Sequence, residues 1–329
     1  MQATGKFTQE ADFRRERDFG AKVGATFEFV VAQFRPLFKC IAYFVLPGAL
    51  VGGIGMGVFM GKYLSLMPTV SADGSTTNVT QNYGTLFTGT SFVGVALATA
   101  GFLTAFLLLS SVVYGFVRVR MSTPAHEAVQ PARVWAFVWK RLGSVVGAWL
   151  LLGIVMVIGT GVLGGALGLA GPGFVGLLFF PLAWVMVCLT LYFPVLMMED
   201  DGVVAAFRRS FYLIRGKWWS SLGLYLVMSF ITGIIHYIFI IPIYALMIGR
   251  TLFGAGFDSE ILSIGAMTFY GTGWIFTATL PLVAMLFQYF NLVERKEGVG
   301  LRMMVNSLGL SGVPQVRNAS YQPDEEGEY

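Results

Sequence analysis

Residues 92–116 read FVGVALATAGFLTAFLLLSSVVYGF, a run of 25 residues without Asp, Glu, Lys or Arg. A helix of about 20 apolar residues is long enough to cross the ~30 Å hydrocarbon core of a bilayer. Five further stretches are equally free of charge, and each is also long enough to cross. They are Cys40–Met60, Gly143–Ala170, Phe174–Met198, Leu222–Ile248 and Gly265–Leu292. The sequence therefore predicts an all-α, polytopic membrane protein with six transmembrane helices.

The composition supports this class. Hydrophobic residues make up 56% of the 329 residues and charged residues only 12%. Soluble globular domains have about 45–50% apolar and about 25% charged residues. We therefore expect a membrane domain over residues 40–292, a cytoplasmic N-terminal segment over 1–39 and a cytoplasmic tail over 293–329, whose end we predict to be disordered.

The distribution of Lys and Arg predicts the orientation. Four alternate connecting segments, both terminal ones included, contain 20 of the 22 basic residues, and the other three loops contain only Lys62 and Arg250. Because basic residues accumulate on the cytoplasmic side of a membrane, both termini are expected there. The net charge of +4 is then explained by topology and by attraction to anionic headgroups. We expect membrane lipids and other membrane proteins as partners, and no nucleic acid.

Three basic segments before the first, third and fifth spans carry apolar residues at helical spacing. Each predicts an amphipathic helix in the cytoplasmic interface, with its apolar face toward the acyl chains. Together with the spans they predict three hairpins, each preceded by such a helix. The apolar positions are Val23, Phe27, Val30, Val31, Phe34 and Phe38; Trp135, Val138, Trp139 and Leu142; and Val203, Val204, Phe207, Phe211, Ile214 and Trp218.

Residues 206–219 read AFRRSFYLIRGKWW. This segment resembles the pattern A-F-x-R-S-x-x-L-x-x-G-x-x-W of the membrane domain that accompanies some glycerophosphoryl diester phosphodiesterases, and of related stand-alone bacterial proteins. The resemblance implies a bacterial inner-membrane location and a similar fold. The phosphodiesterase activity is not expected, because this chain has only His126 and His236 and no soluble catalytic domain.

His236 is the imidazole within a predicted span, and Thr277 and Thr279 are expected at a similar depth in the next one. Ionisable groups inside a membrane are functional candidates. The alternative is a neutral histidine that is hydrogen-bonded between helices. The sequence favours this alternative, because no span contains a carboxylate.

Other polar and small residues have structural interpretations. Glycines in the first and third spans predict close packing of helices. Glu199, Asp200 and Asp201 are expected to cap the helix that follows them, since acidic side chains suit a helix N-terminus. Headgroup contacts are expected from six basic residues. These are Arg35, Arg133, Arg141, Arg208, Arg215 and Lys217.

The sequence contains no motif for a nucleotide, a metal or a catalytic triad, so no cofactor is expected. The leading hypothesis is a non-enzymatic membrane component with a structural, scaffolding or accessory role. The alternative is a transporter or channel for a neutral or lipid-like substrate, with the first, third and fifth spans lining a path past His236. An enzyme acting on lipid headgroups is the third hypothesis.

Overall fold

The computed structural model describes most of the chain. The described residues are 7–66, 69–70, 76–77, 88–170, 175–253 and 259–310. The end of the tail, which is predicted to be disordered, lies outside this part, since the described residues end at 310. Within it, residues 293–310 are mostly helical, because one helix continues to Glu297 and another follows it.

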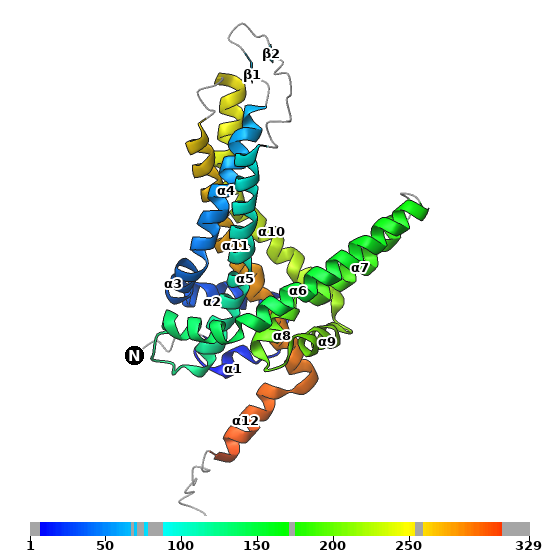
Figure 1. Cartoon of the computed structure of the whole chain (residues 1–329). Coiled ribbons are helices and arrows are strands. Elements are labelled where there is room, and N and C mark those ends of the chain that lie inside the picture. Colours follow the sequence, from blue (N-terminus) through cyan, green and yellow to red (C-terminus); the bar gives the residue numbers. More distant parts are fainter. Residues whose placement is uncertain are drawn as a thin grey trace, which may run out of the picture.

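The described residues form twelve helices and one short pair of antiparallel strands (Figure 1). The helices are α1 (Glu10–Phe13), α2 (Phe19–Ala32), α3 (Phe34–Phe44), α4 (Leu46–Ser65), α5 (Gly89–Ser122), α6 (Pro131–Ala170), α7 (Val175–Leu189), α8 (Tyr192–Met198), α9 (Val203–Ile214), α10 (Trp218–Phe253), α11 (Glu260–Glu297) and α12 (Val299–Leu310). The strands are β1 (Thr69–Val70) and β2 (Thr76–Thr77).

Five helical stretches are long and apolar enough to cross a membrane, and the bent pair α3–α4 makes a sixth if it counts as one span. The predicted all-helical class is confirmed, with the apolar stretches of the sequence lying in these helices. An upright bundle is formed by α4, α5, α10 and α11, in which α4 packs along both α5 and α11 and α10 packs along α11 (Figure 1).

The first predicted span is not straight. The helix breaks at Val45, and α3 and α4 meet there with a bend of 55°. Pro47 lies in the first turn of α4. It lacks the amide hydrogen that would bond to the preceding turn, so a helix tends to begin there rather than continue through. Figure 1 shows α4 upright, with α3 turned away from its axis.

The α6 helix differs from the prediction at its start. It runs without a break from Pro131 to Ala170, so the segment around Trp135 belongs to the same helix as the third span and forms no separate interfacial helix. No proline follows Pro131 within this range, so every later residue keeps the amide hydrogen that a helix needs. In Figure 1, α6 and α7 extend diagonally away from the upright bundle; we call these two helices the arm. Residues 171–174, which join these two helices, lie outside the described residues.

The glycines of α4 pack closely against two neighbouring helices. A methyl group added at Gly55 would lie 2.4 Å from the backbone nitrogen of Ala98 on α5. One added at Gly57 would lie 2.3 Å from the Cα of Ile264 on α11. No real side chain tolerates such distances. The predicted close packing is therefore present on two faces of α4.

The amphipathic segments before the first and fifth spans are helical, but their apolar faces cover protein. Val23, Phe27 and Val30 of α2 pack against residues of α10 and α11. The ring of Phe207 on α9 lies 5.8 Å from that of Tyr192 in α8, centroid to centroid. These residues are therefore half-buried against protein and not laid wholly against acyl chains. Other members of the predicted faces, Val31, Phe34 and Val204, are exposed. The spacing identified the buried face only in part, since α2 buries Ala25 and Phe29 instead.

Candidate functional site: the charged layer at one end of the bundle

Most charged contacts lie at the end of the molecule where α1, α2, α8 and α9 surround the lower part of α5 and α11 (Figure 1). We call it the basic end. It contains an arginine–carboxylate network, a buried lysine and a pocket. The candidate intramembrane site lies apart from it, between α10 and α11.

Glu199, directly after α8, joins three helices through its carboxylate. Arg209 of α9 donates from Nε to Oε2 at 2.9 Å and from Nη2 to Oε1 at 3.2 Å. The hydroxyl of Tyr289 on α11 donates to Oε1 at 2.9 Å. Arg209 also pairs with Glu297, with 2.6 Å between Nη1 and Oε1. The hydrogen bond to Glu297, followed by those to Glu199, raises the pKa of Arg209 above its ordinary value despite its burial. Arg209 is therefore a permanent cation that ties α9 to α11.

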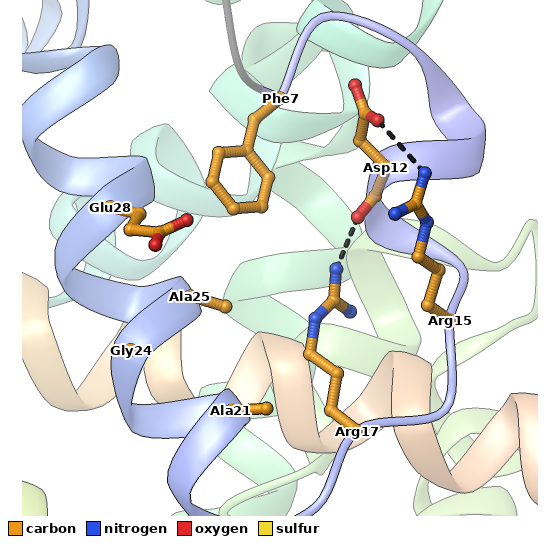
Figure 2. A pocket seen from close by; sticks show the side chains of 8 residues that line it. All are labelled: Phe7, Asp12, Arg15, Arg17, Ala21, Gly24, Ala25 and Glu28. Carbon is orange, nitrogen blue, oxygen red and sulfur yellow. Dashed lines mark hydrogen bonds and ion pairs between the residues drawn. The ribbon is translucent and has the colours of Figure 1, made fainter.

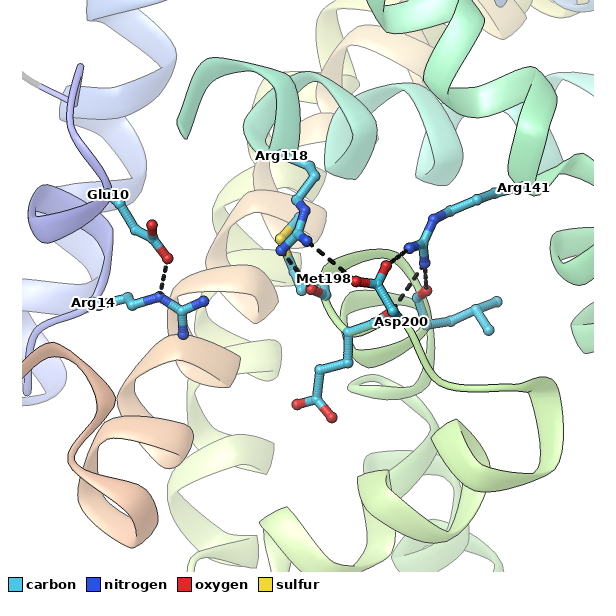
Figure 3. A network of polar contacts seen from close by, with 8 residues as sticks. Glu10, Arg14, Arg118, Arg141, Met198 and Asp200 are labelled. Atoms are coloured by element: carbon cyan, nitrogen blue, oxygen red, sulfur yellow. Dashed lines mark hydrogen bonds and ion pairs between the residues drawn. The ribbon is translucent and has the colours of Figure 1, made fainter. Parts of the chain in front are cut away.

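Two further arginines hold the end of α8 (Figure 3). Arg141 of α6 donates from Nη1 to the carbonyl oxygen of Leu196 at 2.8 Å and from Nη2 to the carboxylate of Asp200. Arg118 of α5 donates from Nη1 to the carbonyl oxygen of Met198 at 2.8 Å and lies 3.7 Å from the carboxylate of Asp200. Carbonyl groups at a helix C-terminus lack intrahelical partners, and these two arginines satisfy them.

The acidic residues after α8 therefore do not act as predicted. The N-cap of α9 is Gly202, which has no side-chain capping bond. Glu199 and Asp200 instead neutralise arginines from other helices. The sequence shows the acids and the helix start side by side, whereas their arginine partners lie 10 to 82 positions away along the chain.

Lys22 of α2 is a buried cation that the sequence did not single out. Its side chain lies against α10 and α11, and only 2% of the residue is exposed. Its Nζ donates to Oε1 of Gln288 at 2.7 Å and to Oγ of Ser220 at 3.3 Å. Gln288 donates in turn to Oγ of Ser221 at 2.8 Å. Burial lowers the pKa of Lys22 to about 8. Gln288, a polar residue in an apolar span, is the one signal in the sequence that pointed to a polar contact here.

A pocket of about 420 Å³ lies between the N-terminal segment and α2 (Figure 2). Small residues of α2 form one wall, and charged residues of both signs surround the space. Its lining is Phe7, Asp12, Arg15, Arg17, Ala21, Gly24, Ala25 and Glu28. Arg17 donates to the carbonyl oxygen of Phe13 at 2.8 Å, and burial lowers its pKa to about 10. With two arginines and two acids, the pocket has no net preference for one sign of charge.

The intramembrane candidates are only partly brought together. Thr277 Oγ1 lies 3.3 Å from His236 Nδ1, within hydrogen-bond distance. Thr279 donates to the carbonyl oxygen of Ile275 at 3.1 Å instead. The other ring nitrogen of His236, Nε2, is buried and has no hydrogen-bond partner among the described residues. The surroundings are aromatic, with the Tyr270 ring edge-on at 4.7 Å between centroids.

The first, third and fifth spans meet one another only in pairs and at different places. α3 packs on α6, and Arg250 of α10 donates to the carbonyl oxygen of Ser65 in α4 at 3.2 Å. These contacts give no support to a path past His236 that all three spans line. Within the described residues, no group of three His, Cys, Asp or Glu side chains could hold a metal ion.

The six basic residues proposed for headgroups fall into two groups. Arg141 is occupied by α8, and Arg133 forms an ion pair of 2.9 Å with Glu127. The other four are exposed, and no ion pair joins them to the part of the chain that the structure describes. They are Arg35, Arg208, Arg215 and Lys217.

The fold is that of a multi-pass helical membrane protein, as the long apolar helices indicate. Comparison of the chain with protein-family models, with curated proteins and with solved structures finds no match. The function therefore has to be inferred from the geometry described above.

Proposed function

We propose that the protein is a non-enzymatic component of a bacterial inner membrane, with both termini in the cytoplasm, that organises or assists other membrane proteins. The observation that carries the proposal is the arm. Its helix α6 turns an apolar face away from the bundle, and Val157 on that face is 71% exposed.

The same face of α6 carries glycines that pack against none of the residues whose side chains the structure describes. A methyl group added at Gly161, Gly164 or Gly165 would meet no described atom within 4 Å. Small residues let two membrane helices approach closely, and their packing replaces the hydrophobic effect as the source of affinity. The arm therefore offers a surface suited to a helix of another membrane protein.

The basic end supports a binding role rather than catalysis. Many of its arginines are paired with carboxylates, and its buried lysine is bonded to amide and hydroxyl groups. Such contacts fix helices in place. A nucleophile activated by a neighbouring base is not found among these groups.

Co-purification tests the proposal. The tagged protein, extracted from its native membrane in a mild detergent, is expected to retain a membrane protein in a fixed ratio. Gly161→Leu/Gly165→Leu should lose that partner while the chain stays folded, and Val157→Leu, which keeps the face apolar, should retain it. No stoichiometric partner of the wild-type protein, or equal retention by both variants, would contradict the proposal.

Transport of a neutral substrate is the second candidate, supported by the unpartnered Nε2 of His236 and the buried, unpartnered hydroxyl of Thr232 one helical turn away. A substrate hydroxyl or carbonyl could bond to these groups. Flux through proteoliposomes that His236→Phe abolishes and Thr279→Val leaves intact would favour this function over the first.

A further inference from the structure

A stripe of exposed side chains follows the outer face of α9 and continues into the turn before α10. Arg208, Tyr212 and Arg215 stand at positions i, i+4 and i+7, which places them above one another on a helix, and all three are exposed. Lys217 follows after Gly216, whose φ of +84° allows the chain to turn there. We call Arg208, Tyr212, Arg215 and Lys217 the α9 stripe.

The charges of the α9 stripe are available, unlike most others at the basic end. Arg209, between Arg208 and Ser210 on the same helix, is occupied by Glu199 and Glu297. Arg208, Arg215 and Lys217 form no ion pair within the described part of the chain. Their surroundings add positive charge, because Nζ of Lys296 lies 4.2 Å from the centre of the Tyr212 ring.

The stripe borders a hollow of about 590 Å³ on the surface of α9. Its lining combines the apolar residues Val204 and Ala205 with Arg208, Arg209, Tyr212 and one acid, Asp201. Arg209 is neutralised by Glu199 and Glu297, so Arg208 supplies the guanidinium for a phosphate, and the apolar residues suit an attached hydrocarbon chain.

The start of α10 indicates where the stripe lies relative to the bilayer. Trp218 and Trp219 begin this helix, which is long and apolar enough to cross a membrane. Trp219 is 76% exposed. Tryptophan at the end of a membrane span prefers the level of the headgroups, and Lys217 directly precedes this pair. The stripe therefore lies at or beside the headgroup level.

We propose that the α9 stripe binds the headgroup phosphates of anionic phospholipids, with Trp219 anchored among the adjoining lipids. This ligand matches three features of the site together: positive charge without ion-pair partners in the described part of the chain, an interfacial tryptophan and apolar lining residues. A soluble polyanion would use only the charge. The proposal deepens the membrane role proposed above and rests on it, since it names the lipid that this end of the protein contacts.

The test uses the full-length protein in a neutral detergent, with phosphatidylglycerol or phosphatidylcholine added and retained lipid measured by native mass spectrometry. The wild type is expected to prefer phosphatidylglycerol by at least tenfold, because a basic residue near the surface contributes roughly fivefold in affinity for an anionic lipid. Arg208→Gln/Arg215→Gln/Lys217→Gln should lose most of this preference. Lys39→Gln/Lys140→Gln/Arg302→Gln, which removes equal charge from exposed positions elsewhere, should keep it.

Trp219 provides a local readout. Its fluorescence is obtained by subtracting the signal of Trp219→Phe from that of the wild type. This fluorescence should be quenched at least twofold more strongly by brominated phosphatidylglycerol than by brominated phosphatidylcholine. This difference in quenching between the two lipids should vanish in Arg208→Gln/Arg215→Gln/Lys217→Gln. Equal quenching in the wild type, or equal loss of preference in both triple variants, would overturn the proposal. So would tight binding of heparin without a preference for phosphatidylglycerol, which would indicate a soluble acidic partner.

The two proposals fail in different ways. Co-purification of a membrane protein by the wild type together with no lipid preference would remove the lipid site and keep the scaffolding role. Lipid preference without any co-purified protein would keep the lipid site and remove the scaffolding role.

Discussion

Two helices of this protein, α4 and α6, are both rich in glycine but have opposite surroundings. In α4, glycines meet the backbones of α5 and α11 on two faces, at distances that exclude any side chain. In α6, Gly153, Gly159 and Gly161 meet nothing within 4 Å among the described residues. A glycine-rich span therefore predicts a capacity for close approach. Whether the approaching helix belongs to the same chain depends on the fold.

The largest effect on stability is expected where α4 packs against α5. Gly101→Ala in α5 would place a methyl carbon 2.2 Å from the backbone nitrogen of Gly52 and 2.6 Å from its Cα. Since both atoms belong to a helix backbone, α4 and α5 must move apart. We expect a loss of about 3 kcal/mol in stability, measured by thermal unfolding in detergent. An unchanged unfolding temperature would show that α4 and α5 are not in close contact.

A smaller loss is expected where polar contacts hold the arm. Arg141→Gln removes the charged hydrogen bonds from α6 to the carbonyl oxygens of Leu196 and Glu199 and to the carboxylate of Asp200. We expect a loss of about 2 kcal/mol in the same measurement. Lys140→Gln, its exposed neighbour, is the matched control and should change stability by less than about 0.5 kcal/mol. Equal effects would mean that the arm does not depend on these bonds.

The buried Lys22 makes the bundle end sensitive to pH. Its pKa is about 8 in the folded protein and 10.5 ordinarily, so between these values the unfolded chain binds more protons. Stability should therefore rise as the pH increases from 8 to 10.5. Lys22→Met should flatten that rise, and Lys217→Met, at an exposed position, should not. Parallel curves for wild type and Lys22→Met, from unfolding at several pH values, would contradict the burial of this lysine.

The smallest effect on stability is expected in α6, whose glycines have no close neighbour among the described residues. Gly161→Ala should leave the isolated protein as stable as the wild type or raise its stability by about 0.5 kcal/mol, because alanine is the better helix former. The same unfolding measurement checks this. A loss comparable to that of Gly101→Ala would show that α6 packs within the chain after all, which would remove the contrast between the two helices.

Much of the architecture followed from the sequence because the physical signal is local. Absence of charge over 25 residues is sufficient to identify a span such as 92–116, and the helices α2 and α9 follow from apolar spacing. What covers an apolar face is not local information. The spacing of Phe27 and Phe207 predicts that each lies on the apolar face of a helix. Only the fold shows that other helices of the protein pack against both.

The polar site was predictable to a lesser degree for the same reason. His236 and Thr277 could be paired because consecutive antiparallel spans place them at one depth. Lys22 and Gln288, however, lie 266 positions apart, and their contact depends on where α2 docks. The partners of Glu199 were missed similarly, since Tyr289 lies 90 positions away.

The lengths of α4 and α6 carry a consequence for how each fits a bilayer. With 20 residues, α4 is about 30 Å long, equal to the hydrocarbon thickness. The charge-free part of α6, Gly143–Ala170, has 28 residues and is about 42 Å long. It exceeds the hydrocarbon thickness and should tilt, in keeping with the diagonal course of the arm in Figure 1. Hydrophobic mismatch is relieved by tilting. A thicker membrane would thus raise the arm toward the bundle, and a thinner one would lower it, while α4 stays upright.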